Sequence, residues 1–105
     1  MVTREQINSL CEDIVRKFGA EKVILFGSYA YGKPRRDSDV DLLVVMPFKG
    51  NNIQKGAELL RATNPGFAVD MLVRTPEEFE RRLNWNDFFM REIVERGRVV
   101  YSIAS

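Results

Sequence analysis

Two aspartates, Asp39 and Asp41, stand two positions apart at the start of the apolar run at residues 42–46. If this segment is a strand, both carboxylates project from the same face of a sheet, about 6.6 Å apart along the chain. Like charges at this distance repel, and burial near a core adds a desolvation cost. A divalent cation would convert the repulsion into attraction. Mg²⁺ suits such a pair because it takes few protein carboxylates and leaves room for substrate phosphates.

A third aspartate bears on how this pair should be read. On their own, Asp39 and Asp41 could be solvated, or Asp39 could cap a turn. Asp70 lies inside the apolar run at residues 67–73, where an unpaired charge is costly. It is therefore either half of an ion pair with a buried arginine or a third carboxylate that strand pairing brings beside the first two.

A Gly-Ser turn is the remaining feature suited to chemistry. Gly27 and Ser28 follow the short apolar run at residues 23–26 and read as a turn that opens a short helix. Glycine permits backbone torsions that other residues resist. A strand, turn and helix in this order direct backbone N–H groups and a hydroxyl toward one point, which makes an anion site. Gly-Ser is common in turns, but its position ten residues before the Asp-x-Asp pattern is more specific.

This spacing of Gly27, Ser28, Asp39 and Asp41, with Asp70 on a later strand, resembles the nucleotidyltransferase superfamily of DNA polymerase β. The small size resembles its minimal, stand-alone branch. So do the segments Gly-Ser-Tyr-Ala-Tyr-Gly at residues 27–32 and Arg-Gly-Arg-Val-Val-Tyr at residues 96–101. The similarity covers nearly the whole chain.

The resemblance implies a fold and a reaction. The fold would be α/β (α+β), a small mixed β-sheet flanked by helices, with residues 1–105 forming a single minimal nucleotidyltransferase domain. The reaction would be Mg²⁺-dependent transfer of a nucleoside monophosphate, AMP from ATP, to a hydroxyl acceptor. Pyrophosphate would be the leaving group.

The resemblance also implies roles for the marked residues. Asp39 and Asp41 would ligate the metal that carries the triphosphate, and Asp70 would bind a second, catalytic metal and help to activate the attacking hydroxyl. Gly27 and Ser28 would hold the β- and γ-phosphates. Two metal ions about 3.5–4 Å apart would stabilise the attacking and leaving oxygens. Positioning and charge neutralisation would then supply most of the catalysis.

One residue departs from the family pattern. The minimal branch usually carries arginine where this chain has Tyr31, so a cationic phosphate contact is missing at that position. Lys33, or Arg35 or Arg36 in the same loop, could supply the charge, although the loop could equally be only solvated. The departure leaves open an alternative function, a catalytically weak module that binds a nucleotide or a partner without turnover.

The acceptor half of a transferase site is not visible in the sequence, so a partner chain or a second copy is expected to complete it. The minimal branch is often paired with a small helical HEPN-type protein. In such pairs it resembles the antitoxin and adds AMP to its partner. The aromatic residues Trp85, Phe88 and Phe89 could form the docking surface. Ordinary core packing of a terminal helix is the simpler explanation for them.

Composition narrows the function classes. The chain has 105 residues, one cysteine and no histidine, which removes His-ligated zinc and catalytic triads. The net charge of +1 gives no field that would attract nucleic acid, so nucleic acid is not an expected partner. No apolar run approaches the length of a membrane span and no signal peptide is recognisable, so we expect a cytoplasmic protein without membrane contact.

Periodicity and capping residues predict nine elements around these residues. The helix at residues 3–18 has a capping box at Thr3 and Gln6 and a stop at Gly19, and Cys11 is expected in its core stripe. A second capping box is expected from Thr75 to Glu78. Further helices are predicted at residues 53–62 (with Ile53, Ala57 and Leu60 facing inward), 76–83 and 87–95, and the turn at residues 27–32 is expected to open a short helix. Strands are predicted at residues 22–26, 39–46, 67–73 and 99–101.

Overall fold

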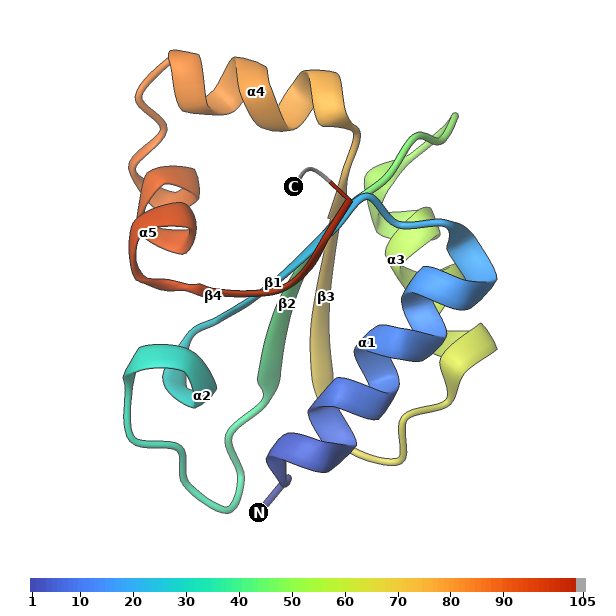
Figure 1. Cartoon of the computed structure of the whole chain (residues 1–105), viewed down its shortest axis with the longest axis vertical. Coiled ribbons are helices and arrows are strands. Elements are labelled where there is room, and N and C mark those ends of the chain that lie inside the picture. Colours follow the sequence, from blue (N-terminus) through green and yellow to red (C-terminus); the bar gives the residue numbers. More distant parts are fainter. Residues whose placement is uncertain (104–105) are drawn as a thin grey trace.

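A four-stranded mixed sheet forms the centre of the computed structural model, which describes residues 1–103 (Figure 1). The strands, in the spatial order β3-β2-β1-β4, are β1 (Lys22–Phe26), β2 (Val40–Val45), β3 (Val69–Arg74) and β4 (Arg98–Ser102). Strand β1 is antiparallel to β2 and β4, whereas β2 and β3 are parallel. The helices are α1 (Arg4–Phe18), α2 (Ser28–Tyr31), α3 (Asn52–Thr63), α4 (Pro76–Asn84) and α5 (Phe88–Arg96). The predicted α+β class and the nine elements are confirmed, with ends that differ by one or two residues.

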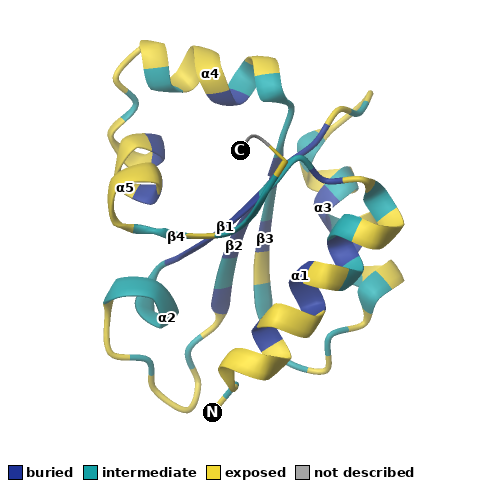
Figure 2. Cartoon of the chain, viewed as in Figure 1, coloured by how far each residue is buried: buried dark blue, intermediate teal, exposed yellow. Residues whose placement is uncertain are grey.

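The helices cover both faces of the sheet. Strand β2 alternates as predicted, so Val40, Leu42 and Val44 pack on one face with α1 and α3. Leu43 and Val45 pack on the other face with residues of α4 and α5. Figure 2 shows the buried stripes of the helices turned toward the sheet and their exposed sides turned outward. Within residues 1–103, no helix is both long and apolar enough to cross a membrane.

Helix α1 begins and ends as the sequence predicts. Thr3 and Gln6 form a reciprocal capping box, and Gly19 ends the helix in the left-handed conformation with φ 65°. Cys11 lies in the buried stripe, and burial raises the pKa of its thiol to about 11. A thiol in this state is protonated at neutral pH, which fits the core role expected for it.

Helix α3 packs Leu60 partly against the core as expected, but its most buried residues are others. Ile53 was predicted to point inward but is 82% exposed, and the buried positions are Gly56 and Leu59. The reason is a close approach of backbones, since a Cβ atom added to Gly56 would lie 2.8 Å from the carbonyl oxygen of Met71 in β3. The helix lies against β3 through the residue with no side chain, and this contact fixes its rotation.

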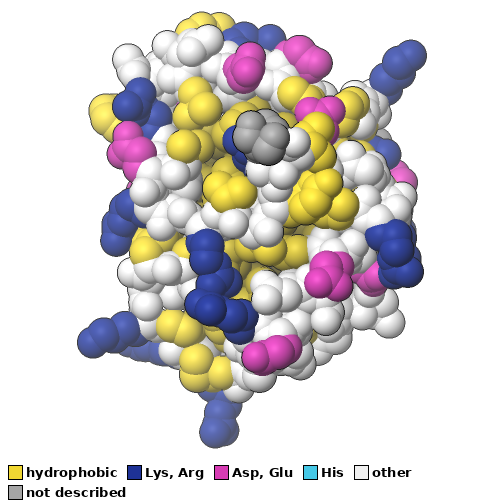
Figure 3. Space-filling view, viewed as in Figure 1, with side chains coloured by type: hydrophobic (Ala, Val, Ile, Leu, Met, Phe, Trp, Pro, Cys, Tyr) yellow, Lys and Arg dark blue, Asp and Glu magenta, His cyan; other side chains and the backbone are white. Residues whose placement is uncertain are grey.

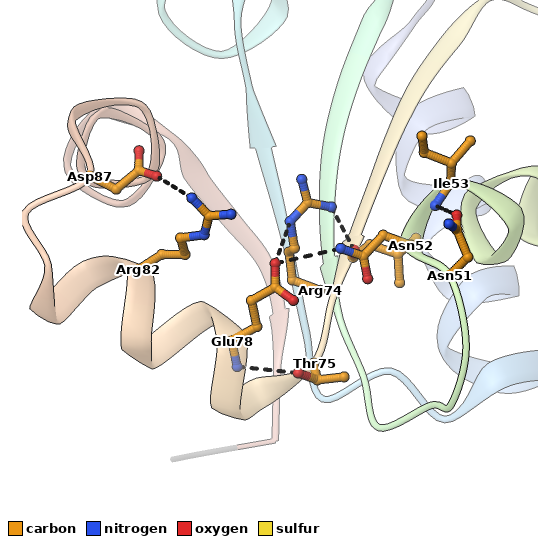
Figure 4. A network of polar contacts seen from close by, with 9 residues as sticks. Asn51, Asn52, Ile53, Arg74, Thr75, Glu78, Arg82 and Asp87 are labelled. Carbon is orange, nitrogen blue, oxygen red and sulfur yellow. Dashed lines mark hydrogen bonds and ion pairs between the residues drawn. The ribbon is translucent and has the colours of Figure 1, made fainter.

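The C-terminal end of β3 is occupied by a network of paired polar groups (Figure 4). Thr75 caps α4 by accepting a hydrogen bond from the backbone N–H of Glu78. The Glu78 carboxylate does not complete the expected capping box, because it lies 3.4 Å from Arg74 Nε and accepts a long hydrogen bond of 3.5 Å from Asn52. Arg74 also donates a hydrogen bond to the carbonyl of Val73. We call this region the paired end of the sheet.

Candidate active site

The opposite end of the sheet gathers the residues that the sequence marked for chemistry. Asp41 and Asp70 are directly paired neighbours in the parallel register of β2 and β3. On its other side, Asp41 is paired with Phe26, the last residue of β1 before Gly27. One end of the sheet therefore brings together the starts of β2 and β3, the end of β1 and helix α2. It is the lower end of the view in Figure 1. We call it the acidic end.

Asp41 carries the strongest sign of electrostatic conflict at this edge. Partial burial raises the pKa of its carboxyl above 3.8, and the negative charges of Asp70 and then Asp39 raise it further. Neither a hydrogen bond nor an ion pair links these three carboxylates to any residue among 1–103. The fold therefore brings like charges together without a cation of its own to offset them.

Strand pairing brings Asp70 beside Asp41, which is one of the two alternatives that the sequence left open. Asp70 was expected to be a costly charge in mid-strand, but it is exposed, because it is the second residue of the edge strand β3. The alternative of an ion pair with a buried arginine is wrong, since the ion pairs of the described chain leave Asp70 out. Register with Asp41, and not burial, is what places this carboxylate.

Asp39 is exposed and precedes β2, which begins one residue later than predicted. It does not cap the preceding turn. That role falls to Ser38, whose hydroxyl accepts a hydrogen bond of 2.8 Å from the backbone N–H of Arg35. The Asp39 carboxylate is therefore not used in a local hydrogen bond, and its negative charge acts on Asp41.

Gly27 fits against Asp41 in a way that only glycine permits. Its φ is 73°, in the left-handed region, and a Cβ atom added there would lie 2.1 Å from Asp41 Oδ2. Its carbonyl accepts hydrogen bonds from the N–H groups of Ala30 and Tyr31, which closes the turn of α2. The Ser28 hydroxyl makes no hydrogen bond within the described chain. The Gly-Ser turn and the Asp41 carboxylate thus lie in direct contact.

The loop that joins α2 to β2, both of which reach the acidic end, carries three basic residues. Lys33, Arg35 and Arg36 are exposed, and within residues 1–103 none of them forms an ion pair. Lys33 forms no hydrogen bond or ion pair with the aspartates or with the Gly-Ser turn within residues 1–103. In Figure 3, Lys and Arg side chains project from the lower end of the molecule, where this loop lies in Figure 1.

Helix α5 borders the site, which was not predicted from the sequence. The Phe89 ring meets Phe26 edge-on, with ring centroids 5.8 Å apart and an interplanar angle of 86°. The Arg96 guanidinium lies over the Tyr31 ring, 4.3 Å from its centroid. Both contacts join distant parts of the chain. The only available signal was the seven-residue spacing of Phe89 and Arg96, which places them on one face of a helix.

The aromatic residues near the C-terminus are largely outside the core. Trp85 is 69% exposed, Phe88 88% and Phe89 52%. Core packing, the simpler expectation, is wrong for Trp85 and Phe88, whereas Phe89 divides its surface between Phe26 and solvent.

The donor set at the acidic end fits a hard cation better than any other metal. Carboxylate oxygens are the ligands that Mg²⁺ prefers, and the repulsion acting on Asp41 would be relieved by a positive charge. Within residues 1–103, no group of three or more His, Cys, Asp or Glu side chains is arranged so that it could hold a metal ion by itself.

Comparison with known proteins agrees with this geometry. The sequence profile of the nucleotidyltransferase domain family matches residues 7–101, and the chain belongs to this family. MJ0604 of Methanocaldococcus jannaschii, provisionally named a protein adenylyltransferase, is 37% identical over 82 residues, which span 77% of this chain and 78% of that protein. The protein adenylyltransferase MntA of Thermococcus cleftensis is 40% identical over 48 residues, 42% of this chain and 48% of that protein. The predicted superfamily and its minimal branch are confirmed.

Two solved structures share the fold. One is a crystal structure of the toxin–antitoxin MntA–HpeT with two Asp-to-Glu substitutions, with a TM-score of 0.60 and 22% identity, covering 98% of this chain and 76% of that chain. The other is a toxin–antitoxin crystal structure with AMP-PNP, with a TM-score of 0.61, 24% identity and the same coverage. At these identities the similarity establishes the nucleotidyltransferase fold.

Proposed function

We propose that this chain, a single minimal nucleotidyltransferase domain over residues 1–105, transfers AMP from ATP to a hydroxyl on a partner protein with release of pyrophosphate. The observation that carries the proposal is the side-by-side register of Asp41 and Asp70 against the Gly27 turn. The protein adenylyltransferase names of the two relatives support AMP as the transferred group. Bound Mg²⁺ ions, one or two, would neutralise charge on the phosphates and on the leaving pyrophosphate.

Each residue of the acidic end has a distinct task in this proposal. Asp39 and Asp41 hold the metal-bound triphosphate, and Asp70 lies beside them to orient the attacking hydroxyl and help to activate it. The free hydroxyl of Ser28 and the first N–H groups of α2 bind the β- and γ-phosphates. Gly27 lets the backbone come close enough for both sets of contacts, because it carries no Cβ atom.

Charge compensation for the triphosphate must also come from the protein. The aspartates and the triphosphate are all negative, and Tyr31 supplies no charge. Lys33, exposed and unpaired within the described chain, is the loop cation that we assign to the phosphates. Its long, flexible side chain would have to close over the nucleotide, so it should add affinity more than precise geometry.

The acceptor is assigned to a partner protein. The solved structures that share this fold are toxin–antitoxin assemblies, which supports an antitoxin role beside a small helical HEPN-type protein. Trp85 and Phe88 are the aromatic side chains that we expect the partner to cover, since both are mostly exposed. A second copy of this chain is the other occupant to be tested. We assign the binding of the partner and the transfer of AMP to the cytoplasm, where ATP is present.

A second candidate function follows from Tyr31. If the missing arginine cannot be replaced, the domain would bind nucleotide or partner without turnover. The side-by-side register of Asp41 and Asp70 supports a ligand at the acidic end in either case, because unrelieved repulsion only destabilises the folded chain. Binding and turnover therefore have to be measured separately.

The test begins with calorimetric titration of ATP into the wild type and Asp41→Asn, with Mg²⁺ and with a chelator. Asp13→Asn is the matched control, because Asp13 forms ion pairs on α1 with Arg16 and Lys17 and lies outside the acidic end. We expect Mg²⁺-dependent binding in the wild type and the control. In Asp41→Asn the affinity for ATP should fall by more than roughly 10- to 100-fold. That range is typical when a residue that only hydrogen-bonds to a metal ligand is replaced, whereas Asp41 is assigned as a ligand itself.

Turnover is then followed with ATP labelled at the α-phosphate, mixed with the co-expressed partner. Transfer of label to a protein hydroxyl by the wild type and the control, but not by Asp41→Asn, supports the enzyme. Tight binding without label transfer supports the second candidate. If the wild type fails to bind ATP both alone and with its partner, the proposed function is wrong.

A further inference from the structure

Helix α5 presents one face to the acidic end of the sheet. Phe89, Ile93 and Arg96 are spaced by four and three residues, so they lie on the same side of the helix. Ile93, in the middle, is 1% exposed and packs in the core layer that also contains Phe26. The residues on either side of it are therefore directed toward the same layer, and the helix is held in place by a buried anchor.

The two ends of this face contact the residues that flank the Gly-Ser turn. Phe89 packs on Phe26, the residue immediately before the turn. Arg96 lies over Tyr31, the last residue of α2, whose backbone N–H donates a 3.1 Å hydrogen bond to the carbonyl of Gly27. A positive charge from the far end of the chain is thereby placed against the short helix that begins at the turn.

The guanidinium of Arg96 is available to a ligand. Its ion pair with Glu92, at 3.3 Å, is exposed on both sides, and such pairs contribute little to stability. Arginine has five N–H donors in a planar fork, so donors remain even while Glu92 is held. Stacking on the Tyr31 ring restricts the side chain, which lowers the entropy lost when it binds an anion.

Other cations near this edge are placed less favourably. Lys33 has no contact that orients it. Arg98, two residues beyond Arg96, acts on the buried thiol of Cys11 and thus lies on the sheet face covered by α1. Arg91, on α5 itself, is engaged with Asn86 and Glu95. Arg96 combines an oriented guanidinium, solvent access and contact with α2.

We propose that Arg96 is a substrate-binding residue, which uses its guanidinium to hold the terminal phosphates of the nucleoside triphosphate at the Gly-Ser turn. The inference rests on the proposed function, because it needs a triphosphate at the acidic end. It assigns to α5 a direct part in the site, with Tyr31 as the positioning residue that holds the guanidinium. Arginine and phosphate match geometrically through two parallel N–H to oxygen hydrogen bonds.

The experiment compares binding of AMP-PNP and AMP, each with Mg²⁺, by calorimetry. Arg96→Ala removes the guanidinium, and Arg91→Ala is the control from the same helix with a similar exposed i,i+4 ion pair. Tyr31→Phe keeps the ring under Arg96, whereas Tyr31→Leu removes it. Thermal unfolding of each variant reports whether the fold is intact.

We expect Arg96→Ala to weaken AMP-PNP binding by about 10- to 100-fold, the range for a lost hydrogen bond to a charged group. AMP, which lacks the terminal phosphates, should bind as to the wild type. Tyr31→Leu should weaken AMP-PNP binding less than Arg96→Ala, and Tyr31→Phe and Arg91→Ala should have no effect.

Three results would overturn the inference. Unchanged AMP-PNP binding in Arg96→Ala, while the wild type binds, refutes it and leaves the proposed function intact. Equal losses for AMP and AMP-PNP show that Arg96 acts on the fold of the site and not on the terminal phosphates. If the wild type binds no AMP-PNP at all, the proposed function fails and this assignment fails with it.

Discussion

The two ends of the sheet treat charge in opposite ways. At the paired end, Arg74 and Glu78 lie 3.4 Å apart and Asn52 donates to the same carboxylate. At the acidic end, Asp41 and Asp70 are register neighbours with the same charge and no cation is paired with either within the described chain. Both ends belong to the same strands, β2 and β3, and only three residues of β3 separate Asp70 from Arg74.

This difference distinguishes charges that stabilise the fold, at the paired end, from charges that destabilise it, at the acidic end. A network that pairs opposite charges contributes to stability. A group of like charges weakens the folded state, so selection for stability alone would not keep it. Under the proposed function, the cost of the acidic end is offset when the metal-bound nucleotide binds there. Variants at the two ends should therefore affect different properties.

The largest effect is expected from Gly27→Ala at the acidic end. The new Cβ atom would overlap Asp41 Oδ2, which is the end of a flexible side chain and can swing away. The fold should therefore lose about 1–3 kcal/mol, the cost of holding alanine at φ 73° and ψ −157°, a backbone region essentially confined to glycine. Turnover should fall by about 100-fold or more, because a misplacement of about 1 Å is worth that much. Label transfer and urea unfolding measure the two quantities.

Gly19→Ala is the matched control for this variant. Gly19 has a φ of 65°, close to that of Gly27, but no atom lies within 4 Å of the Cβ position. Its ψ of 38° places it in the left-handed helical region, so Gly19→Ala should lose about 1–2 kcal/mol of stability and retain wild-type turnover. If both alanine variants were equally active, close contact between the turn and Asp41 would have no role in the reaction.

A smaller, purely structural effect is expected from Glu78→Ala at the paired end. Arg74 Nε is shut off from solvent and makes no hydrogen bond, so the Glu78 carboxylate is its charge partner. Removing it should cost about 1–3 kcal/mol of unfolding free energy. The melting temperature should fall by about 4–8 °C for each kcal/mol in a domain of this size. The ATP affinity, measured by calorimetry at a temperature where the variant is folded, should not change.

Glu77→Ala isolates this effect, because Glu77 also lies in the first turn of α4 but is exposed and forms no ion pair within residues 1–103. Both variants lose the same interaction with the helix dipole. A Glu78→Ala variant as stable as Glu77→Ala would mean that the Arg74 pair adds nothing. Lost ATP affinity would mean that the two ends are not independent.

Much of this contrast can be predicted from local sequence. Thr3, Gly19 and Thr75 mark helix ends through rules that act within a few residues, and each is found where expected. The alternation of Asp41 with apolar neighbours also fixes its face of the sheet, since side-chain direction in a strand has a period of two. Family resemblance adds the expectation that Asp70 joins it.

The rest depends on contacts between distant segments. The exposure of Asp70 follows from β3 being an edge strand, which is a property of the sheet order and not of its apolar neighbours. Ile53 turns outward because Gly56 packs on the backbone of β3. The contact of Arg96 with Tyr31 joins residues 65 positions apart in sequence. No periodicity or motif encodes such pairs, so they require the structure.

The smallest effect expected is a pH dependence of stability that originates at the acidic end. The pKa of Asp41 is raised in the folded protein above 3.8, so the folded state binds a proton more tightly than the unfolded state does. The free energy of unfolding contributed by this group is thus highest when the carboxyl is protonated. It falls as the pH rises from 3.8 through the raised pKa, and the full penalty remains at neutral pH. The effect is small because Asp41 is only partly buried.

Urea unfolding of the wild type and Asp41→Asn across this pH range, in the presence of a chelator, measures the effect as a difference that cancels the other carboxylates. The advantage of Asp41→Asn in stability should grow as the pH rises and then level off. Asp70→Asn should reduce the slope only in part, because burial is the larger cause of the shift and Asp39 remains. A difference that is flat with pH would mean that folding does not raise the pKa of Asp41, so that neither burial nor the neighbouring charges act on it. The cost that distinguishes the acidic end from the paired end would then have another origin.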